Sequence, residues 1–381
     1  MERYTKACPM VVETGGPGSG KTDGLAYFSE ELSNKGFAHV FTVPEVATMV
    51  FASGITNIPE IMATDRARYV EIERRILRMQ LMLEEQMHGF VSLCPGEKSV
   101  LLLDRGAMDV AAYLTKDEFE RILKEERLDY YDVRDRYDVV VHLVTAAIGA
   151  EQFYTKANNK ARSEDIATAR LLDKRTQDAW TGAAHFRAID NSTDFEGKLQ
   201  RAFKVVARGL KIPVPLEIER KFLVRSMPDF SALGVHAQPV DIEQQYLIPN
   251  ADGDEVRIRR RSQGNTNVYY RTVKKKSPLH HFARLENEDI ITADEYRALT
   301  MYRAPHSRVV RKTRWCFVHE FQYFELDAIV LPGELFLLEI ELTEENDVLT
   351  LPSFVDFLRE VTDDERYTNA AIARGECPLV P

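Results

Sequence analysis

Cysteine is scarce in this chain, and its cysteines are widely separated. The four cysteines among 381 residues form no Cys-x-x-Cys pair. This scatter argues against a disulfide framework or a zinc site and is typical of reduced thiols in a cytoplasmic protein. Long apolar runs are also absent, since none approaches the ~20 residues of a membrane span. The polar start Met1-Glu2-Arg3 predicts no signal peptide.

A basic surplus is missing as well. The chain has 50 Lys and Arg against 60 Asp and Glu, which gives a net charge of −10. Because nucleic-acid binders are usually basic, we expect no nucleic-acid partner. The lack of long apolar runs and the scattered cysteines predict no transmembrane segment and a cytoplasmic location. The length is sufficient for two globular domains. The proline-bearing joint at 212–215 separates the predicted domains, 1–211 and 216–381.

The first half carries a phosphate-binding pattern. Met10-Val11-Val12 reads as a buried strand that leads to residues 15–22, Gly-Gly-Pro-Gly-Ser-Gly-Lys-Thr, and then to a helical pattern. This is the G-x-x-x-x-G-K-[ST] P-loop in its strand–loop–helix context, which surrounds phosphate oxygens with backbone N–H groups. Lys21 is expected to reach the β- and γ-phosphates, and Thr22 to ligate Mg²⁺. The predicted phosphate-binding residues are Gly15, Gly18, Ser19, Gly20, Lys21 and Thr22.

Two carboxylates follow strand-like runs in this half. Glu45 comes after residues 39–43, and Asp104-Arg105 comes after the apolar run 99–103. The carboxyl ends of parallel strands are where such sheets bind ligands. Asp104 is in the Walker B position, placed to bind Mg²⁺, and Arg105 is placed to contact a substrate phosphate. Glu45 either accepts a proton from a hydroxyl acceptor or begins a helix, and we predict catalytic roles for all three.

Two later segments complete the predicted nucleotide site. Arg162 and Arg170 lie on a helical pattern and are expected to close over phosphates, although a solvated charged helix has the same pattern. The loop 191–196 is expected to hold the nucleobase. No guanine-recognition motif is present, so ATP and GTP both remain open.

The first half resembles a known family. Gly-Gly-Pro-Gly-Ser-Gly-Lys-Thr, Val-Pro-Glu, Leu-Asp-Arg-Gly and Ile-Asp-Asn-Ser are similar to motifs of the P-loop kinases related to the NadR-type ribosylnicotinamide kinase domain. The resemblance implies an α/β P-loop fold, a parallel sheet with helices on both faces, and nucleotide binding. It does not name the phosphoryl acceptor.

Residues 216–224 begin a different pattern, in which apolar and charged side chains alternate. Glu217, Glu219 and Lys221 therefore share one face of a predicted strand. Carboxylates about 6–7 Å apart suit a hard cation, with an ammonium beside them for an anion. A solvent-exposed strand would read the same, but similar i, i+2 pairs recur in later segments. These are Arg257/Arg259, Thr272/Lys274, Glu286/Glu288, Lys312/Arg314, Glu325/Asp327 and Glu339/Glu341.

A closed, eight-stranded antiparallel barrel with a charged lumen accounts for this recurrence. Two closing helices are expected near 353–361 and 368–374. Lys221 is the predicted catalytic residue of the lumen. The predicted phosphate-binding residues are Arg257, Arg259, Lys274, Lys312 and Arg314. The predicted Mg²⁺ or Mn²⁺ ligands are Glu217, Glu219, Glu286, Glu288, Asp327, Glu339 and Glu341, with Thr22 and Asp104 in the first domain.

This half resembles the CYTH, or triphosphate tunnel metalloenzyme, superfamily. The similar segments include Glu-Ile-Glu-Arg-Lys, Arg-Ile-Arg, Lys-Thr-Arg-Trp and Leu-Glu-Ile-Glu-Leu. The resemblance implies hydrolysis of tripolyphosphate, a nucleoside triphosphate or thiamine triphosphate, or an adenylyl-cyclase activity. The pairing with a P-loop domain resembles plant P-loop–tunnel proteins and the TRPL translocation defect family. The latter implies a GTP- and phospholipid-binding trafficking switch, so the expected enzyme has this switch as its alternative.

Overall fold

The protein is described here by a computed structural model covering residues 8–94, 96, 98–154, 165–212, 218–250, 253–276, 284–331, 333–342 and 347–378. The chain divides into two compact units, Met1–Pro213 and Val214–Pro381. Arg162 and Glu217 lie outside the described residues, and only the backbone of Glu286 is described. The remaining predicted site residues are described with their side chains.

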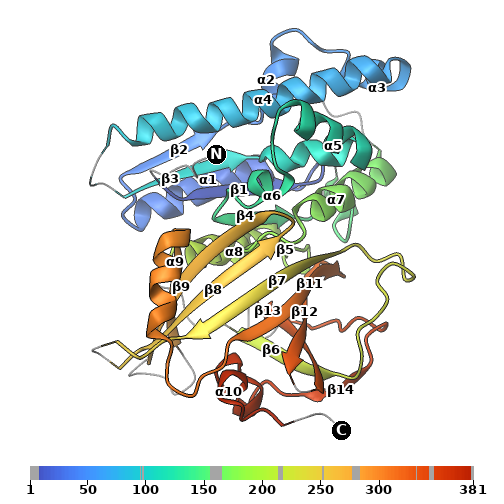
Figure 1. Ribbon diagram of the computed structural model, residues 1–381. Helices are drawn as coiled ribbons and strands as arrows, with labels where there is room; N and C mark the ends of the chain where they lie inside the picture. Colours follow the sequence, from blue (N-terminus) through green and yellow to red (C-terminus); the bar gives the residue numbers. More distant parts are fainter. Residues whose placement is uncertain are drawn as a thin grey trace. The chain divides into compact units, whose positions relative to one another are not determined.

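The first unit is built on a parallel sheet of five strands in the order β2-β3-β1-β4-β5 (Figure 1). All its pairings are parallel. The central strands are apolar and buried, as expected when helices cover both faces of a sheet. The strands are β1 (Met10–Gly15), β2 (His39–Val43), β3 (Ser99–Asp104), β4 (Val139–Leu143) and β5 (Phe186–Ile189).

Helices cover this sheet on both sides. The chain moves from β1 outward to β2 through α1 and returns to β3 through α4, so right-handed crossovers place these two helices on opposite faces. Helix α8 packs with α1, and α7 contacts η1 and β1. The helices are α1 (Lys21–Asn34), α2 (Val46–Ala52), α3 (Ile58–Thr64), α4 (Arg66–Val91), α5 (Lys116–Glu125), α6 (Tyr130–Arg134), α7 (Ile166–Trp180) and α8 (Phe195–Gly209), with 3-10 turns η1 (Ala107–Tyr113) and η2 (Glu151–Phe153).

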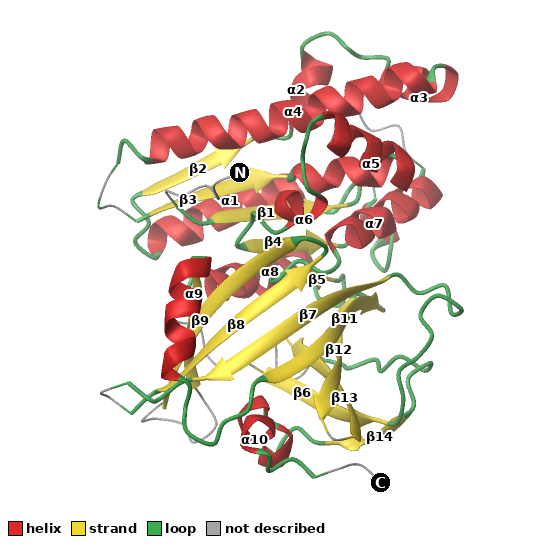
Figure 2. Cartoon of the chain, viewed as in Figure 1, coloured by secondary structure: helices red, strands yellow, loops and turns green. Residues whose placement is uncertain are grey.

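The second unit is mostly strand (Figure 2), and all pairings in its sheet are antiparallel. Nine strands follow the order β10-β9-β8-β7-β11-β12-β13-β6-β14, so the predicted number of eight is wrong. In the described part of the chain, β10 and β14 are the two edge strands, and each pairs with one neighbour. The strands are β6 (Ile218–Val224), β7 (Ala237–Tyr246), β8 (Glu255–Gln263), β9 (Thr266–Lys276), β10 (Arg284–Ile291), β11 (Val310–His319), β12 (Gln322–Leu331), β13 (Gly333–Leu342) and β14 (Phe357–Glu360).

The ninth strand replaces a predicted helix. Residues 353–361 were expected to be helical, but Phe357–Glu360 forms β14 and pairs with the free edge of β6 through an irregular register. The backbone groups of an edge strand need partners, and this requirement outweighs the local apolar spacing. The remaining short elements are α9 (Ala293–Leu299), η3 (Thr300–Tyr302), η4 (Glu365–Tyr367) and α10 (Asn369–Arg374). The second predicted helix, at 368–374, therefore corresponds to α10.

The structure also describes the cysteines and the lengths of the helices. No disulfide joins Cys8, Cys94, Cys316 or Cys377. Among the described residues, no helix is both long enough and apolar enough to cross a membrane.

Candidate functional sites

The P-loop is held by its carbonyl groups. Each carbonyl from residue 15 to 20 accepts a hydrogen bond, either from the start of α1 or from a more distant part of the unit. The donors are Lys21 Nζ to Gly15 and Gly16 (both 3.3 Å), Thr145 Oγ1 to Pro17, Ala146 N to Gly18 (3.1 Å), Lys198 Nζ to Ser19 (3.2 Å) and Gly24 N to Gly20 (3.0 Å). In a trans peptide the N–H points opposite to the preceding carbonyl. The amides of residues 18–21 therefore point away from these donors, as phosphate binding requires.

Two glycines of the loop have a backbone conformation that other residues rarely adopt. Gly18 has φ 74° and Gly20 has φ 95°, both in the left-handed region that favours glycine. A Cβ on Gly20 would also lie 2.5 Å from the Phe195 ring. Substituting Gly20 would therefore strain the loop in both conformation and packing.

Lys21 and Asp104 provide opposite charges beside the loop. Burial, followed by the Arg105 guanidinium, lowers the pKa of Lys21. Burial also raises the pKa of Asp104, and the Glu45 carboxylate adds to that rise. Asp104 Oδ1 is buried and accepts no hydrogen bond within the described part of the chain. A carboxylate oxygen without a hydrogen-bond partner fits Mg²⁺, which prefers oxygen ligands, and Thr22 is exposed.

Glu45 and Arg105 form a salt bridge beside Lys21. Arg105 Nε lies 2.5 Å from Glu45 Oε1, and Arg105 Nη1 lies 3.0 Å from Asp109 Oδ1. Burial by itself would raise the pKa of Glu45, but Arg105 and Lys21 lower it to about 2. Arg105 has φ 70°, uncommon for a residue other than glycine. The structure thus brings three predicted residues, Glu45, Asp104 and Arg105, together with Lys21.

Asp109 supports this group and was not predicted. Its carboxylate accepts hydrogen bonds from Thr14 Oγ1, Gly106 N (3.0 Å) and Trp180 Nε1 (3.2 Å) in addition to Arg105. Its spacing of four residues from Arg105 was the available signal. The local sequence offers no indication that Trp180 is a partner.

Glu13 was also missed. It lies opposite Asp104 in the register of β1 and β3, is 0% exposed, and neither of its carboxylate oxygens has a hydrogen-bond partner in the described chain. Burial, followed by the Asp104 charge, raises its pKa well above the usual value. A charged residue in the otherwise apolar run before the P-loop was the signal that could have revealed it.

Arg170 does not join the P-loop in the contacts described. Its Nε donates to Ala147 O (2.7 Å), and its Nη2 pairs with Glu151 Oε1 (2.8 Å). It therefore ties α7 to the loop after β4. Its predicted phosphate-binding role remains a prediction, and Arg162 lies outside the described residues.

In the second unit, strand register places the predicted charges on one face of the sheet. Lys221 is opposite Glu339, Glu219 opposite Glu341, and Arg314 opposite Asp327. The same alternation continues through β7 into β8, β9 and β10, where Arg257 is opposite Thr272 and Thr272 opposite Glu288. Since directly paired residues point to the same side, these side chains share one face.

A buried ion network lies at the centre of this face. Arg314 makes a two-point contact with Asp327 (Nε–Oδ1 and Nη2–Oδ2, both 2.7 Å) and a further one with Glu339 Oε2 (2.6 Å). Lys221 Nζ lies 3.0 Å from Glu339 Oε1, and Lys312 Nζ lies 2.5 Å from Asp327 Oδ2. All five side chains are buried. Burial would raise the pKa of Glu339, but Lys221 and Lys312 hold it well below its usual range.

A second cluster lies on β8, β9 and β10. Arg259 Nη2 contacts both oxygens of Glu288 (2.8 and 2.9 Å), and Thr272 Oγ1 donates to Glu288 Oε2 (2.8 Å). Arg257 Nη2 is 3.7 Å from Glu288 Oε2. The predicted cations and the predicted metal ligand Glu288 are therefore paired with each other in this structure.

The sheet curls, so that a carboxylate of β6 interacts electrostatically with a lysine of β9. Desolvation and the neighbouring Glu339 carboxylate raise the pKa of Glu219 on β6, and Lys274 on β9 is among the cations that oppose the rise. Five strands separate β6 from β9 in the sheet order, so only curvature brings these side chains within electrostatic reach. The Glu219 side chain is 52% exposed, so a ligand from solvent can reach it.

No preformed metal centre is present among the described residues, where no group of three or more His, Cys, Asp or Glu side chains is arranged to hold an ion. Glu217 and the Glu286 side chain fall outside that description. Glu219, Glu339 and Glu341 share a face, and the repulsion between Glu219 and Glu339 is the kind that a cation relieves. These carboxylates therefore fit a hard cation that binds together with its anionic ligand.

Comparison with known proteins gives a family match in the first unit and a relative for the C-terminal part of the chain. Residues 10–198 match the AAA domain family. A C-terminal stretch is 37% identical over 161 residues to the inorganic triphosphatase of Nitrosomonas europaea, covering 41% of this chain and 96% of that protein. A crystal structure of an inorganic triphosphatase is 32% identical and covers 42% of this chain and 96% of its own, with a TM-score of 0.31. A Pyrococcus horikoshii protein of known structure is 22% identical over 34% of this chain and 81% of its own, with a TM-score of 0.27.

Proposed function

Because the C-terminal part of this chain belongs to the family of the Nitrosomonas europaea inorganic triphosphatase, we propose that the second unit hydrolyses a triphosphate at its charged face. The observation that carries the proposal is the shared face on which buried cations and carboxylates alternate. Inorganic tripolyphosphate is the first substrate to test, followed by ATP and GTP. Charge of both signs on one face of the sheet suits a polyanion that arrives with a divalent cation.

The residues divide into two roles. Arg257, Arg259, Lys274, Lys312 and Arg314 bind phosphate oxygens and neutralise the charge that develops on them. Glu219, Glu339 and Glu341, with Glu217, would hold Mg²⁺ or Mn²⁺. The metal would supply Lewis acidity at the terminal phosphoryl group. Lys221, fixed 3.0 Å from Glu339, positions that phosphoryl group or the attacking water.

The ion pairs in the structure mean that a bound substrate competes with carboxylates for the same cations. Arg259 and Glu288 are paired, so a phosphate that binds Arg259 must share or displace the Glu288 carboxylate. Arg314 and Lys312 are likewise paired with Asp327. The network keeps the cations ordered and desolvated before the substrate arrives, which is the condition under which they act most strongly.

For the first unit we propose binding of Mg²⁺ with ATP or GTP. The P-loop amides and Lys21 would hold the phosphates, Thr22 and Asp104 the metal, and Glu45 and Arg105 would face the γ-phosphate or its acceptor. This site either phosphorylates a small acceptor or regulates the second unit. The AAA domain match and the orientation of the loop amides support nucleotide binding.

The test is phosphate release from tripolyphosphate, ATP and GTP with Mg²⁺ or Mn²⁺. We expect Glu219→Gln/Glu339→Gln to lose at least 100-fold in turnover, since it removes two carboxylates from the face, and Lys21→Ala to keep it. Glu334→Gln is the matched control, because Glu334 lies on β13 but is exposed and out of phase with Glu339. No release from any triphosphate would contradict the hydrolase proposal. Tight nucleotide or phospholipid binding without turnover would then favour a switch, and cyclic nucleotide with pyrophosphate would indicate a cyclase.

A further inference from the structure

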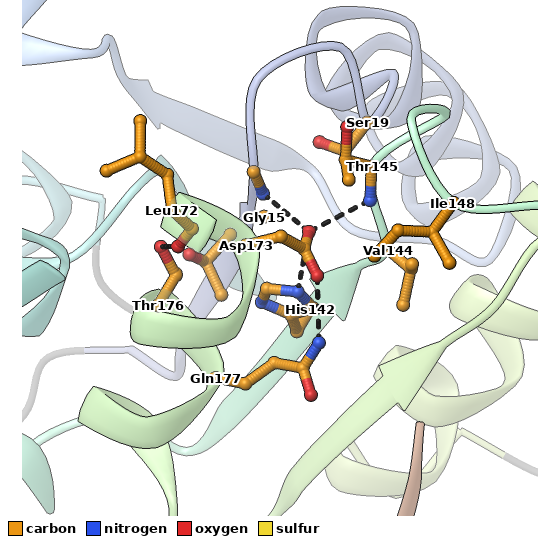
Figure 3. A network of polar contacts seen from close by, with 12 residues as sticks. Gly15, Ser19, His142, Val144, Thr145, Ile148, Leu172, Asp173, Thr176 and Gln177 are labelled. Carbon is orange, nitrogen blue, oxygen red and sulfur yellow. Dashed lines mark hydrogen bonds and ion pairs between the residues drawn. The ribbon is translucent and has the colours of Figure 1, made fainter. Parts of the chain in front are cut away.

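Helix α7 holds the P-loop through a single buried carboxylate. Asp173 is 0% exposed, and its Oδ1 accepts hydrogen bonds from Gly16 N (3.0 Å) and Thr145 N (2.9 Å). Its Oδ2 accepts from Gln177 Nε2 (2.8 Å). His142 Nε2 lies 3.1 Å from Oδ1. Figure 3 shows Asp173 between His142, Thr145 and Gln177, so this one side chain joins α7, β4 and the P-loop.

The contact between Asp173 and the loop is also tightly packed. A Cβ on Gly16 would lie 2.7 Å from both Asp173 Cβ and Asp173 Oδ1, so position 16 has no room for a side chain while Asp173 is in place. Burial would raise the pKa of Asp173, but His142 and the two amide donors hold it below the usual value. Asp173 is thus an ionised acceptor that fixes the first turn of the loop.

The backbone amides of the loop have two different roles, and this makes the contact with Asp173 relevant to ligand binding. The amides of residues 18–21 point away from the donors that hold the carbonyls of residues 17–20, whereas the Gly16 amide donates to Asp173. Pro17 between them has no N–H. The anchoring amide and the ligand-facing amides are therefore different groups, and the first sets the position of the others.

The same helix reaches the other side of the site. Trp180 at the end of α7 donates to Asp109 Oδ2 (3.2 Å), and Asp109 Oδ1 accepts from Arg105 Nη1 (3.0 Å). Helix α7 thus contacts the P-loop through Asp173 and is linked to the Glu45–Arg105 pair through Asp109. A displacement of α7 would shift both together.

We propose that Asp173 is a positioning residue that sets the phosphate-binding conformation of the P-loop from helix α7. This inference rests on the proposed nucleotide binding by the first unit. Asp173 does not touch the ligand, and it acts through the Gly16 and Thr145 amides. Removing it leaves two buried N–H groups without an acceptor and frees the loop to rearrange.

The experiment is calorimetric titration of the full chain with Mg²⁺-ATP and Mg²⁺-GTP, at a temperature well below the measured Tm of each variant. We expect Asp173→Ala to bind at least tenfold more weakly, and Asp173→Asn to recover to within threefold of wild type, because an amide oxygen accepts the same two bonds. Asp178→Asn is the matched control, since Asp178 is on α7 but pairs with Lys174 instead. We expect it to bind within twofold of wild type.

The outcomes separate the two proposals. If wild type binds neither nucleotide, the proposed nucleotide site is wrong, whatever the variants do. If wild type binds and folded Asp173→Ala binds within threefold of it, or Asp173→Asn binds no better than Asp173→Ala, the positioning role is overturned. A merely structural aspartate would lower Tm and leave affinity unchanged.

If Asp173→Ala does not fold, the Gly16→Ala variant tests the role instead, since its Cβ strains the same contact. Tenfold weaker binding supports the role, and binding within threefold overturns it.

Discussion

At the scale of single residues, several ionisable side chains of the first unit lie so close that the charge of each affects the pKa of the others. Glu45 is held ionised by Arg105 and Lys21, with a pKa of about 2 against an ordinary 4.5. A carboxyl whose pKa is depressed on folding adds stability above its unfolded pKa and loses that contribution as the pH falls through the folded value. The relevant window therefore runs from 4.5 down to about 2.

Glu45→Gln should remove that contribution. We expect wild type to exceed the variant in unfolding free energy by up to about 3 kcal/mol above pH 5, and the difference to shrink toward pH 2. Urea unfolding between pH 2 and 7 measures it. Glu60→Gln, at an exposed glutamate of α3, is the control. A wild-type advantage that stays constant across the window would contradict the assigned role of Arg105.

Arg314 is the residue that joins the carboxylates of the second unit. Its planar guanidinium contacts Asp327 at two points and Glu339 and Glu325 at one each, a geometry that a lysine ammonium cannot reproduce. We expect Arg314→Lys to destabilise the second unit by about 2–4 kcal/mol and to lower triphosphate turnover. Arg311→Lys on the same strand is the matched control, since its side chain is 62% exposed and we expect a change under about 0.5 kcal/mol. Equal effects of the two substitutions in urea unfolding would count against the network.

At the scale of elements, α1 packs so closely on β1 that the usual helix preference reverses. Alanine is favoured over glycine inside a helix by about 1 kcal/mol. A Cβ on Gly24 would lie 1.9 Å from Glu13 Oε1, beneath the P-loop. The close approach of helix and strand therefore depends on glycine at this position.

Gly24→Ala should accordingly destabilise the first unit by about 1–3 kcal/mol. Glu13→Ala should remove most of that penalty in the double variant, which a double-mutant cycle of urea unfolding measures. Gly89→Ala in α4 is the control, since no atom lies within 4 Å of its added Cβ, and it should stabilise by up to about 1 kcal/mol. Additive effects at positions 13 and 24 would show that the two side chains do not compete for space.

At the scale of the whole molecule, each of the two compact units has its own sheet and its own charged site. A ligand stabilises only the unit that it binds, by about 2.7 kcal/mol at 100 times its Kd. Scanning calorimetry should therefore show two transitions, one raised by Mg²⁺-nucleotide and the other by tripolyphosphate. Lys21→Ala should abolish the nucleotide shift alone. A single transition moved equally by both ligands would show that the units unfold together.

Several features could be read directly because they depend on neighbouring residues. The P-loop is one short motif, and the alternation around Glu219 and Lys221 assigns side chains to a face before any partner strand is known. The parallel sheet of the first unit and the antiparallel sheet of the second were predicted correctly. Continuous apolar runs indicate buried parallel strands, and alternating apolar and charged residues indicate antiparallel ones. The prediction of a helix at 353–361 was wrong because this edge strand forms by pairing with β6. The spacing of its own apolar residues does not reveal that pairing.

The sequence by itself determined the two sheet types, the phosphate loop and the set of charges that share one strand face, since these follow from local order and period. Only the tertiary structure decided which charges pair and which groups hold the loop. Asp173 lies 157 positions from Gly16, and Lys198 lies 179 from Ser19. Contacts between such distant positions arise from packing of whole elements, which leaves no trace in the local pattern of either partner.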